Sequence, residues 1–511
     1  MGKTLRSFGD YLRSRKRIIG LFAPVLFGVL FMILCMPQLH QSLGADESYS
    51  AYLTRFEPAK IYELSAQNSQ PPLYYFALKV WAHFFGHTDF AMRMLSVICG
   101  ATAILFAYLW LRYKHGLAAA ITAASLLALS PTLVHFGQTM TAPAMAIAIV
   151  FAASYVLQLA INNRKIWWLI YGILLVAGIY TNYCCALAWL AHIAYLALVF
   201  RKKIFQKSII ITFLASTVAC IPCFINRFQY GIKEAELSAQ SLADYWARAL
   251  IYQDSGMLKN WLLVLAIAAS VFLIVLVVRT HRQSRMLLSL AIVPLLAQML
   301  LSLPPLQSIS SPERIAFSMA AISLVSGISL VLLARQKLPK RNRAVRKKRA
   351  AIIVLSSLLF FATNICGLVN VYSLGNYNFQ TASKSSGREL YGMIAALDAG
   401  RSLAAICASE SLYLELSSYT TKEHSVYFMN ETATYDNAAT YPLRDSTIGR
   451  IDNLDAFIAK RDSFLFLTTL NRETNELASN FPREGWRTEE YTTTRFDGDN
   501  SVYAIVKMVK E

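Results

Sequence analysis

The sequence predicts an α-helical polytopic membrane protein that carries a small α/β domain after its helical part. Three observations predict this class. Of the 511 residues, 56% are hydrophobic and only 15% are charged, and the mean hydropathy is +0.42, values typical of membrane proteins. Many apolar residues fall in runs near the roughly 20 residues that a helix needs to cross a bilayer. Residues 373–511 contain no such run.

We expect about eleven transmembrane helices. Two of the apolar segments are separated only by the short polar stretch Tyr180-Thr181-Asn182-Tyr183, so a different division of these two segments is an alternative. The candidate spans are 18–36, 90–111, 117–135, 143–161, 167–180, 183–200, 208–225, 260–278, 286–303, 314–334 and 350–372.

The basic residues predict the orientation. With the N-terminus in the cytoplasm, the segments on that side carry 26 Lys and Arg residues, whereas the opposite side of the membrane region carries nine. This bias follows the positive-inside rule, provided that 71–86 does not span. The run from Lys337 to Arg349 is then a cytoplasmic loop near anionic lipid headgroups, so the net charge of +19 requires no nucleic-acid partner. The first apolar segment has no cleavage motif and is expected to remain as an uncleaved signal anchor.

The first external loop, 37–89, is expected to contain an interfacial helix. The pair Pro71-Pro72 opens a helix-like run that continues to Phe85, with Lys79 and His83 four positions apart on one face. Proline is favoured at the first position of a helix. A run of this length is too short to span and suits a helix that lies in the bilayer surface.

The C-terminal segment, 373–511, differs in kind from the bundle. It has 14 Lys and Arg against 19 Asp and Glu residues, and the topology places it outside the cytoplasm. Its pattern predicts helices over 387–397 and 454–460 and strands over 403–408, 464–468 and 502–509. The expected organisation is therefore a membrane domain, 1–372, followed by a small extracytoplasmic α/β domain, 373–511.

Neither a disulfide framework nor a metal site is predicted. Seven of the eight cysteines fall in apolar helices, and only Cys407 lies in the polar segment. His40, His87 and His135 lie near the external face without the spacing of metal ligands. No cofactor is therefore predicted from the residues, although a divalent metal stays open as an alternative.

The acidic pair Asp46-Glu47 is the most informative local feature. An adjacent Asp-Glu pair taken alone is more often a solvated loop than a site. Here, however, the acidic residues of the membrane region other than Asp10 all fall on the external face, and Arg93 and Arg314 lie at helix mouths on that face. A carboxylate there can deprotonate a hydroxyl, and arginine can stabilise a departing phosphate. The residues alone indicate a membrane enzyme or transporter for an amphiphilic anion.

An ordered set of motifs over roughly residues 40–115 resembles the GT-C glycosyltransferases, among them the protein O-mannosyltransferases and the lipid A aminoarabinose transferases. Asp46-Glu47 resembles their acidic motif in the first external loop. Gln70-Pro71-Pro72-Leu73-Tyr74-Tyr75 resembles their His-Pro-Pro-Leu-Tyr-Tyr stretch. Matching residues continue through Trp81, Phe85-Gly86 and Phe90-Ala91-Met92-Arg93-Met94-Leu95-Ser96, with fainter echoes at Leu129-Ser130-Pro131, Tyr180-Thr181-Asn182-Tyr183 and Glu313-Arg314.

The resemblance implies a GT-C bundle and an inverting hexosyl or pentosyl transfer. The donor would be a polyprenyl-phosphate sugar, and the acceptor a glycan, lipid or protein of the cell envelope, at the external face of the cell membrane. Asp46 would be the general base, and Glu47 would support it or position the acceptor. The candidate substrate-binding residues are Gln70, Tyr74, Tyr75, Lys79, Arg93, Asn182 and Arg314.

Three positions depart from the family pattern, and they predict donor-sugar or acceptor contacts that differ from those of the better-known members. Gln70 stands where the family usually has His or Lys, and Asn182 replaces a frequent His. The Arg-Tyr element common after the third helix appears here as Gln138-Thr139-Met140-Thr141-Ala142-Pro143.

Two other functions are compatible with these residues. One is a transporter or flippase of lipid-linked saccharides, and the other is a scaffold whose acidic C-terminal segment binds a partner. Transporters usually place ionisable groups near the middle of the bilayer, whereas this chain keeps them at the helix mouths, which favours an enzyme.

Overall fold

The computed structural model describes two compact units. The described residues are 2–162, 165–200, 205–229, 284–301, 312–335, parts of 351–372, 386–398, 403–420, 426–429, 449–470, 485–494 and 502–511. The first unit, here called the helical unit, comprises Met1–Leu39, Ser69–Tyr74 and Arg93–Tyr377. The second, the α/β unit, comprises His40–Asn68, Tyr75–Met92 and Asn378–Glu511. Most of the first external loop therefore shares a unit with the C-terminal segment.

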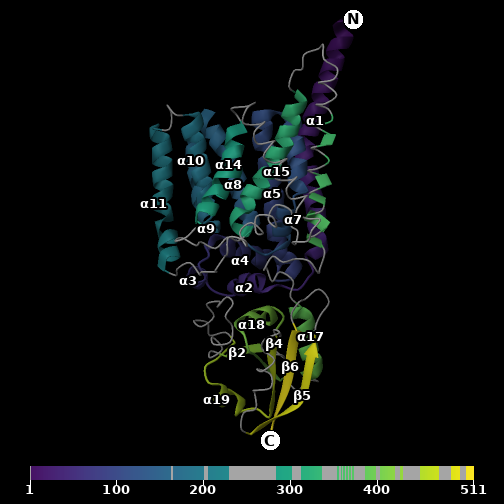
Figure 1. Cartoon of the computed structure of the whole chain (residues 1–511), viewed down its shortest axis with the longest axis vertical. Helices are drawn as coiled ribbons and strands as arrows, with labels where there is room; N and C mark the ends of the chain where they lie inside the picture. The colour runs from purple at the N-terminus through teal and green to yellow at the C-terminus, as the bar shows by residue number, and fades with distance from the viewer. Residues whose placement is uncertain are drawn as a thin grey trace. The chain divides into compact units, whose positions relative to one another are not determined.

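Four described helices are long and apolar enough to cross a membrane. They agree with predicted spans, and Figure 1 shows α5, α8 and α11 with their axes roughly parallel. Helix α1 begins well before its apolar part, which is Ile18–Gln38 and includes the short 3₁₀ turn Met36–Gln38. The four helices are α1 (Gly2–Cys35), α5 (Asp89–His115), α8 (Pro143–Asn162) and α11 (Lys207–Gln229).

The predicted span 117–135 is broken into two helices. Helix α6 covers Leu117–Ala128, helix α7 covers Pro131–Gln138, and the two are bent by 54°. The cause is Pro131, which lacks a backbone donor and restricts the preceding residue to extended conformations. Ser130 accordingly has φ −66° and ψ 120°, and Pro131 starts the new helix.

The remaining apolar helices are shorter or only partly described. The division at Tyr180–Tyr183 is confirmed, because Asn182 is extended and its side-chain carbonyl accepts a hydrogen bond from the Cys184 N–H at 2.9 Å. The predicted segment 260–278 lies outside the described residues, and 350–372 is described only in part. The other described helices of the bundle are α9 (Ile166–Thr181), α10 (Cys185–Val199), α14 (Arg285–Leu301) and α15 (Pro312–Arg335).

Small residues bring the helices of the bundle close together. Gly327 of α15 lies against α6 so closely that a Cβ added to it would be 2.5 Å from the Ala123 Cα. Helix α5 reaches α1 through a hydrogen bond from the Tyr108 hydroxyl to the Gly20 carbonyl at 2.8 Å. Close backbone approach at small residues is the usual way in which membrane helices pack without a hydrophobic driving force.

The α/β unit contains a six-stranded mixed sheet with the order β3-β2-β1-β4-β6-β5. Strands β3, β2, β1 and β4 run parallel to one another, whereas β6 runs antiparallel to both β4 and β5. The predicted helices and strands of the segment agree with the structure in position. The strands are β1 (Ala404–Cys407), β2 (Val426–Met429), β3 (Arg450–Ile451), β4 (Ser463–Leu470), β5 (Trp486–Thr494) and β6 (Val502–Lys510), and the helices are α17 (Gly387–Asp398), α18 (Glu410–Ser417) and α19 (Leu454–Ile458).

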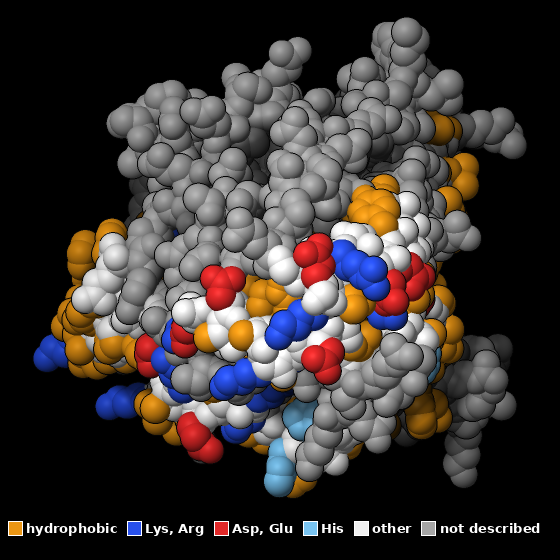
Figure 2. All heavy atoms as spheres, turned by 90° about the horizontal axis from the view of Figure 1, so that it is seen from below, with side chains coloured by type: hydrophobic (Ala, Val, Ile, Leu, Met, Phe, Trp, Pro, Cys, Tyr) orange, Lys and Arg blue, Asp and Glu red, His pale blue; other side chains and the backbone are white. Residues whose placement is uncertain are grey.

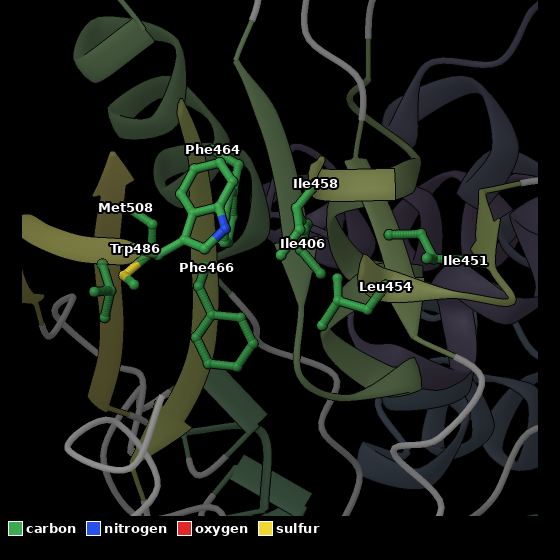
Figure 3. Close-up of a cluster of buried hydrophobic side chains, with 9 residues drawn as sticks. Ile406, Ile451, Leu454, Ile458, Phe464, Phe466, Trp486 and Met508 are labelled. Carbon is green, nitrogen blue, oxygen red and sulfur yellow. The ribbon is translucent and has the colours of Figure 1, made fainter. Parts of the chain in front are cut away.

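An apolar cluster stabilises this sheet. Figure 3 shows side chains of β1, β4 and β6 gathered with those of α19. The Phe464 and Trp486 rings meet edge to face with centroids 4.9 Å apart. Two caps fix the helices beside the sheet: the Ser409 side chain accepts from Leu412 N–H in α18, and the Asn453 side chain accepts from Ala456 N–H in α19.

Three helices form the first external loop. They are α2 (Ala45–Leu53), α3 (Pro58–Gln67) and α4 (Leu73–Phe85). The predicted helix that ends at Phe85 is thus confirmed as a helix, while its location in the bilayer surface stays a prediction. Val80, Phe84 and Phe85 of α4 are exposed, which is the pattern of a helix with an apolar face available to lipid.

Candidate active site around the acidic pair

Asp46 and Glu47 open helix α2 and have different surroundings. Gly44 is the extended N-cap residue, and its N–H donates to the Glu47 carboxylate at 3.3 Å, while its carbonyl accepts from the Ser48 N–H at 2.8 Å. The Glu47 side chain is only 2% exposed, whereas Asp46 is exposed. Glu47 therefore completes the helix start, and Asp46 is the carboxylate that a substrate can reach.

Aromatic residues fix α2 against its neighbours in the loop. The Tyr49 hydroxyl donates to the Leu64 carbonyl of α3 at 2.9 Å. The Tyr49 ring meets Tyr75 of α4 edge to face, with centroids 6.3 Å apart. Burial raises the pKa of Tyr49 well above its ordinary value, so its hydroxyl stays a neutral donor. The structure thus brings Tyr75, a predicted site residue, onto the helix that carries the acidic pair.

Lys79 of α4 binds the other end of α2. Its Nζ donates to the Thr54 carbonyl at 3.1 Å and to the Phe56 carbonyl at 2.7 Å. A cation at a helix C-terminus satisfies carbonyls that have no partner in the helix and is favoured by the helix dipole. These contacts give Lys79 a structural task that the sequence did not predict.

In the helical unit, Arg93 and Tyr74 are also held by their neighbours. Arg93 is 1% exposed, and its Nη1 donates to the Leu39 carbonyl at 3.1 Å and the Gln38 carbonyl at 3.4 Å, just beyond α1. The Tyr74 hydroxyl is 3.2 Å from the Ser96 hydroxyl of α5. Part of the Arg93 guanidinium is therefore engaged in holding the end of α1.

The other predicted residues, Gln70, Asn182 and Arg314, belong to the helical unit. Asn182 accepts from the Cys184 N–H in the turn between α9 and α10. Gln70 is half-buried directly before Pro71. Arg314 is in the first turn of α15, and its side chain lies outside what the structure describes.

Three residues of the C-terminal segment, not predicted from the sequence, contact the loop just before the acidic pair. Arg388, Glu389 and Tyr419 make hydrogen bonds with residues of the stretch 40–43. The partners Ser42 and Glu389 are 347 positions apart. Separations of this size leave no periodic or motif signal in a single sequence, so only the structure reveals the pairing.

The side chains of the described residues that could ligate a metal are not grouped as a metal centre requires. No group of three or more His, Cys, Asp or Glu side chains there could hold a metal ion. His40 instead stacks on Phe90, with ring centroids 4.8 Å apart. Figure 2 shows acidic and basic side chains interspersed on the described part of the face it presents, rather than a surface of one sign.

Comparisons with known proteins identify the fold. Residues 69–226 match the family described as dolichyl-phosphate-mannose-protein mannosyltransferase. No curated protein sequence matches the chain. The solved structures of ArnT from Cupriavidus metallidurans are similar, both apo (TM-score 0.56) and bound to undecaprenyl phosphate (TM-score 0.57); each is 12% identical and covers 94% of this chain and 97% of that chain.

The chain also has a weaker structural similarity to a second kind of transferase. The oligosaccharyltransferase of Archaeoglobus fulgidus, in complex with Zn and sulfate, aligns with a TM-score of 0.50 at 13% identity. The alignment covers 79% of this chain and 62% of that chain. The likeness to ArnT, by contrast, extends over nearly the full length of both chains.

Proposed function

We propose that the chain is a membrane glycosyltransferase of the GT-C superfamily and that it moves a sugar from a polyprenyl-phosphate donor to a glycan, lipid or protein acceptor of the cell envelope; the family match over residues 69–226 and the ArnT-like fold support this. The observation that carries the proposal is the acidic pair at the start of α2. It presents one exposed carboxylate, Asp46, beside a buried one, Glu47, that is bonded to the helix N-cap. A similar fold is known with undecaprenyl phosphate bound.

The reaction is a single displacement at the anomeric carbon. The Asp46 carboxylate takes the proton from an acceptor hydroxyl, and the acceptor oxygen forms a bond to the anomeric carbon from the face opposite the phosphate. The bond between the anomeric carbon and the phosphate oxygen breaks, and polyprenyl phosphate leaves with the bonding electrons. The anomeric configuration is inverted in the product.

The remaining parts of the proposal concern the donor phosphate. Arg93 and Arg314 are the proposed phosphate contacts, because arginine stabilises a leaving phosphate by charge and by paired donors. Gln70 and Asn182 are the proposed sugar contacts, since both are neutral side chains that can donate and accept. The described residues do not fit a metal centre, so no step is assigned to a metal.

The test compares Asp46→Asn with Glu47→Gln. Full-length protein in membranes is incubated with radiolabelled undecaprenyl-phosphate hexoses and pentoses, and the label that leaves the donor is measured. Asp46→Asn should lower kcat by about 10²- to 10⁴-fold, the range of a lost general base. Glu47→Gln should lower it less, because the amide oxygen still accepts from the Gly44 N–H.

Glu63→Gln is the matched control, because Glu63 is an exposed carboxylate of α3 in the same loop and pairs only with nearby side chains. It should leave kcat unchanged. Near-normal turnover by Asp46→Asn would refute the role of base, and a larger loss in Glu47→Gln would reverse the two roles. Passage of the intact donor across the membrane without loss of its sugar would instead identify a flippase.

A further inference from the structure

The loop directly before the acidic pair is bonded to helix α17. The Ser42 hydroxyl donates to the Glu389 carboxylate at 2.7 Å and accepts from the Arg388 backbone N–H at 3.3 Å. The Arg388 guanidinium donates to the His40 carbonyl at 3.0 Å. Ser42 is 3% exposed, so these bonds are protected from competing water. Two successive residues of α17 thus fix two positions, 40 and 42, just ahead of Asp46.

Tyr419, two residues beyond α18, completes this connection. Its hydroxyl accepts from the Leu43 N–H at 2.8 Å and donates to the Asp89 carboxylate at 2.9 Å. Asp89 is buried and also forms an ion pair with Arg388. A phenol has one proton to donate, and here it is directed to Asp89, which leaves the oxygen to accept from Leu43. The next residue, Gly44, is the N-cap of α2.

The C-terminal end of α2 is held by helix α18 of the C-terminal segment. Arg55 donates from Nη2 to the Ser417 carbonyl at 2.6 Å. The buried Tyr52 and Tyr413 rings meet edge to face with centroids 6.3 Å apart. Helix α18 packs along α2. The helix that carries Asp46 is therefore fixed at both ends by residues from the C-terminal segment.

We propose that Tyr419 and Arg388 are positioning residues for Asp46, so that the C-terminal segment forms part of the active site instead of acting as a separate module. The inference rests on the proposed function, since it takes Asp46 as the base. Their hydrogen bonds set the backbone of residues 40–43 and thereby the orientation of the first turn of α2. A displacement of about 1 Å in a reacting group can cost on the order of 100-fold in rate.

The first test is Tyr419→Phe, which removes one oxygen and keeps the ring. With the donor that supports wild-type turnover, kcat should fall about 10- to 100-fold while the KM for that donor changes less than about threefold. Tyr491→Phe is the matched control, because Tyr491 is 50% exposed on β5 of the same unit. The control should retain wild-type kcat.

A double variant distinguishes a loss of kcat that acts through the position of Asp46 from a loss caused by an independent structural defect. If Tyr419 acts through Asp46, adding Tyr419→Phe to Asp46→Asn should cause no further loss of kcat, since residues that act as one unit are not additive. A further loss of similar size in the double variant would overturn the inference. So would wild-type kcat in Tyr419→Phe when Asp46→Asn is inactive, and that result would leave the proposed function intact. Full turnover by Asp46→Asn would refute the proposed base itself.

A measurement that does not depend on catalysis tests whether these hydrogen bonds hold the start of α2 in place. Amide hydrogen exchange of the segment 42–48 should accelerate in Tyr419→Phe and in Arg388→Gln but not in Tyr491→Phe. Tyr419→Phe removes the acceptor of the Leu43 N–H, and Arg388→Gln removes the guanidinium that holds the His40 carbonyl. With the preceding loop released, the first turn of α2, where the Ser48 N–H donates to the Gly44 carbonyl, should open more often. Unchanged protection of this segment in both positioning variants would show that the contacts do not hold α2 and would overturn the inference.

Discussion

Three buried phenols give the α/β unit a defined response to alkaline pH. Burial, as the largest cause, raises the pKa values of Tyr49, Tyr413 and Tyr419 above their ordinary value near 10; for Tyr419 the Asp89 carboxylate raises it further. The folded state therefore keeps these protons when the unfolded chain has begun to lose them. Stability from these groups is complete below about pH 10 and is lost as the pH rises through the folded pKa values.

The expected result is a transition temperature in detergent that is constant from pH 7 to 9 and falls steeply above pH 10. Tyr419→Phe removes one of the three groups, so its transition temperature should fall less steeply between pH 10 and 11.5. Thermal unfolding followed by tryptophan fluorescence at each pH measures both slopes, and equal slopes would contradict the assignment of Tyr419 as a buried neutral phenol.

The sequence indicates a functional role for a single residue most clearly when its side-chain type is uncommon in the chain. Two adjacent carboxylates stand out in a sequence with 15% charged residues, and the structure gives the two different surroundings. Lys79 and Asn182 are predicted substrate contacts, and the structure gives each a backbone partner as well: Lys79 donates to carbonyls just beyond α2, and Asn182 accepts from the Cys184 N–H before α10. Both residue types serve equally well as caps and as ligands, and one sequence without coordinates cannot separate the two uses.

At the scale of helices and strands, the contact between α15 and α6 makes a prediction about packing. A Cβ on Gly327 would meet the backbone of Ala123 at 2.5 Å, so Gly327→Ala must push the helices apart. The expected loss of stability is about 1–3 kcal/mol, as for other overpacked sites, seen as a lower transition temperature in detergent.

Gly392→Ala is the matched control for that substitution. It lies inside α17, and a Cβ there meets nothing within 4 Å. Alanine is favoured over glycine within a helix by about 0.5–1 kcal/mol, so this variant should be slightly more stable than the wild type. If both variants shifted the transition temperature in the same direction, close packing at Gly327 would not be the cause.

The helices and strands whose positions the sequence predicts correctly are those with a clear local pattern of apolar residues or a clear start signal. Strands β4 and β6 are apolar and flanked by polar residues, and α4 starts at a proline pair, so their positions follow from local pattern. The break between α6 and α7 was missed, because an apolar run of spanning length masks a proline that starts a new helix. Helices α2 and α3 were missed too, since both are short and are held by tertiary contacts more than by propensity.

At the scale of the whole molecule, the α/β unit constrains the topology. It is one compact unit built from 40–68, 75–92 and 378–511, and Ser42 is hydrogen-bonded to Glu389 within it. No described helix long enough to span a bilayer lies wholly within this unit, so its three segments must lie on one side of the membrane. The chain between these segments therefore crosses the bilayer an even number of times. Ten of the eleven predicted spans lie between 90 and 372, which meets this condition.

The sidedness follows from this parity together with the charges, and fusions test it. The bias of Lys and Arg predicts an N-terminus in the cytoplasm, so the first loop, Asp46 and the C-terminus are all expected outside. Alkaline phosphatase, which is active only outside the cytoplasm, should be active when fused after Glu511 and inactive when fused after Gly116 in the turn between α5 and α6. A fluorescent cytoplasmic reporter should give the opposite result at both positions. Cytoplasmic activity after Glu511 would place Asp46 on the cytoplasmic side as well, because both belong to the same compact unit, and an external sugar transfer would then be untenable.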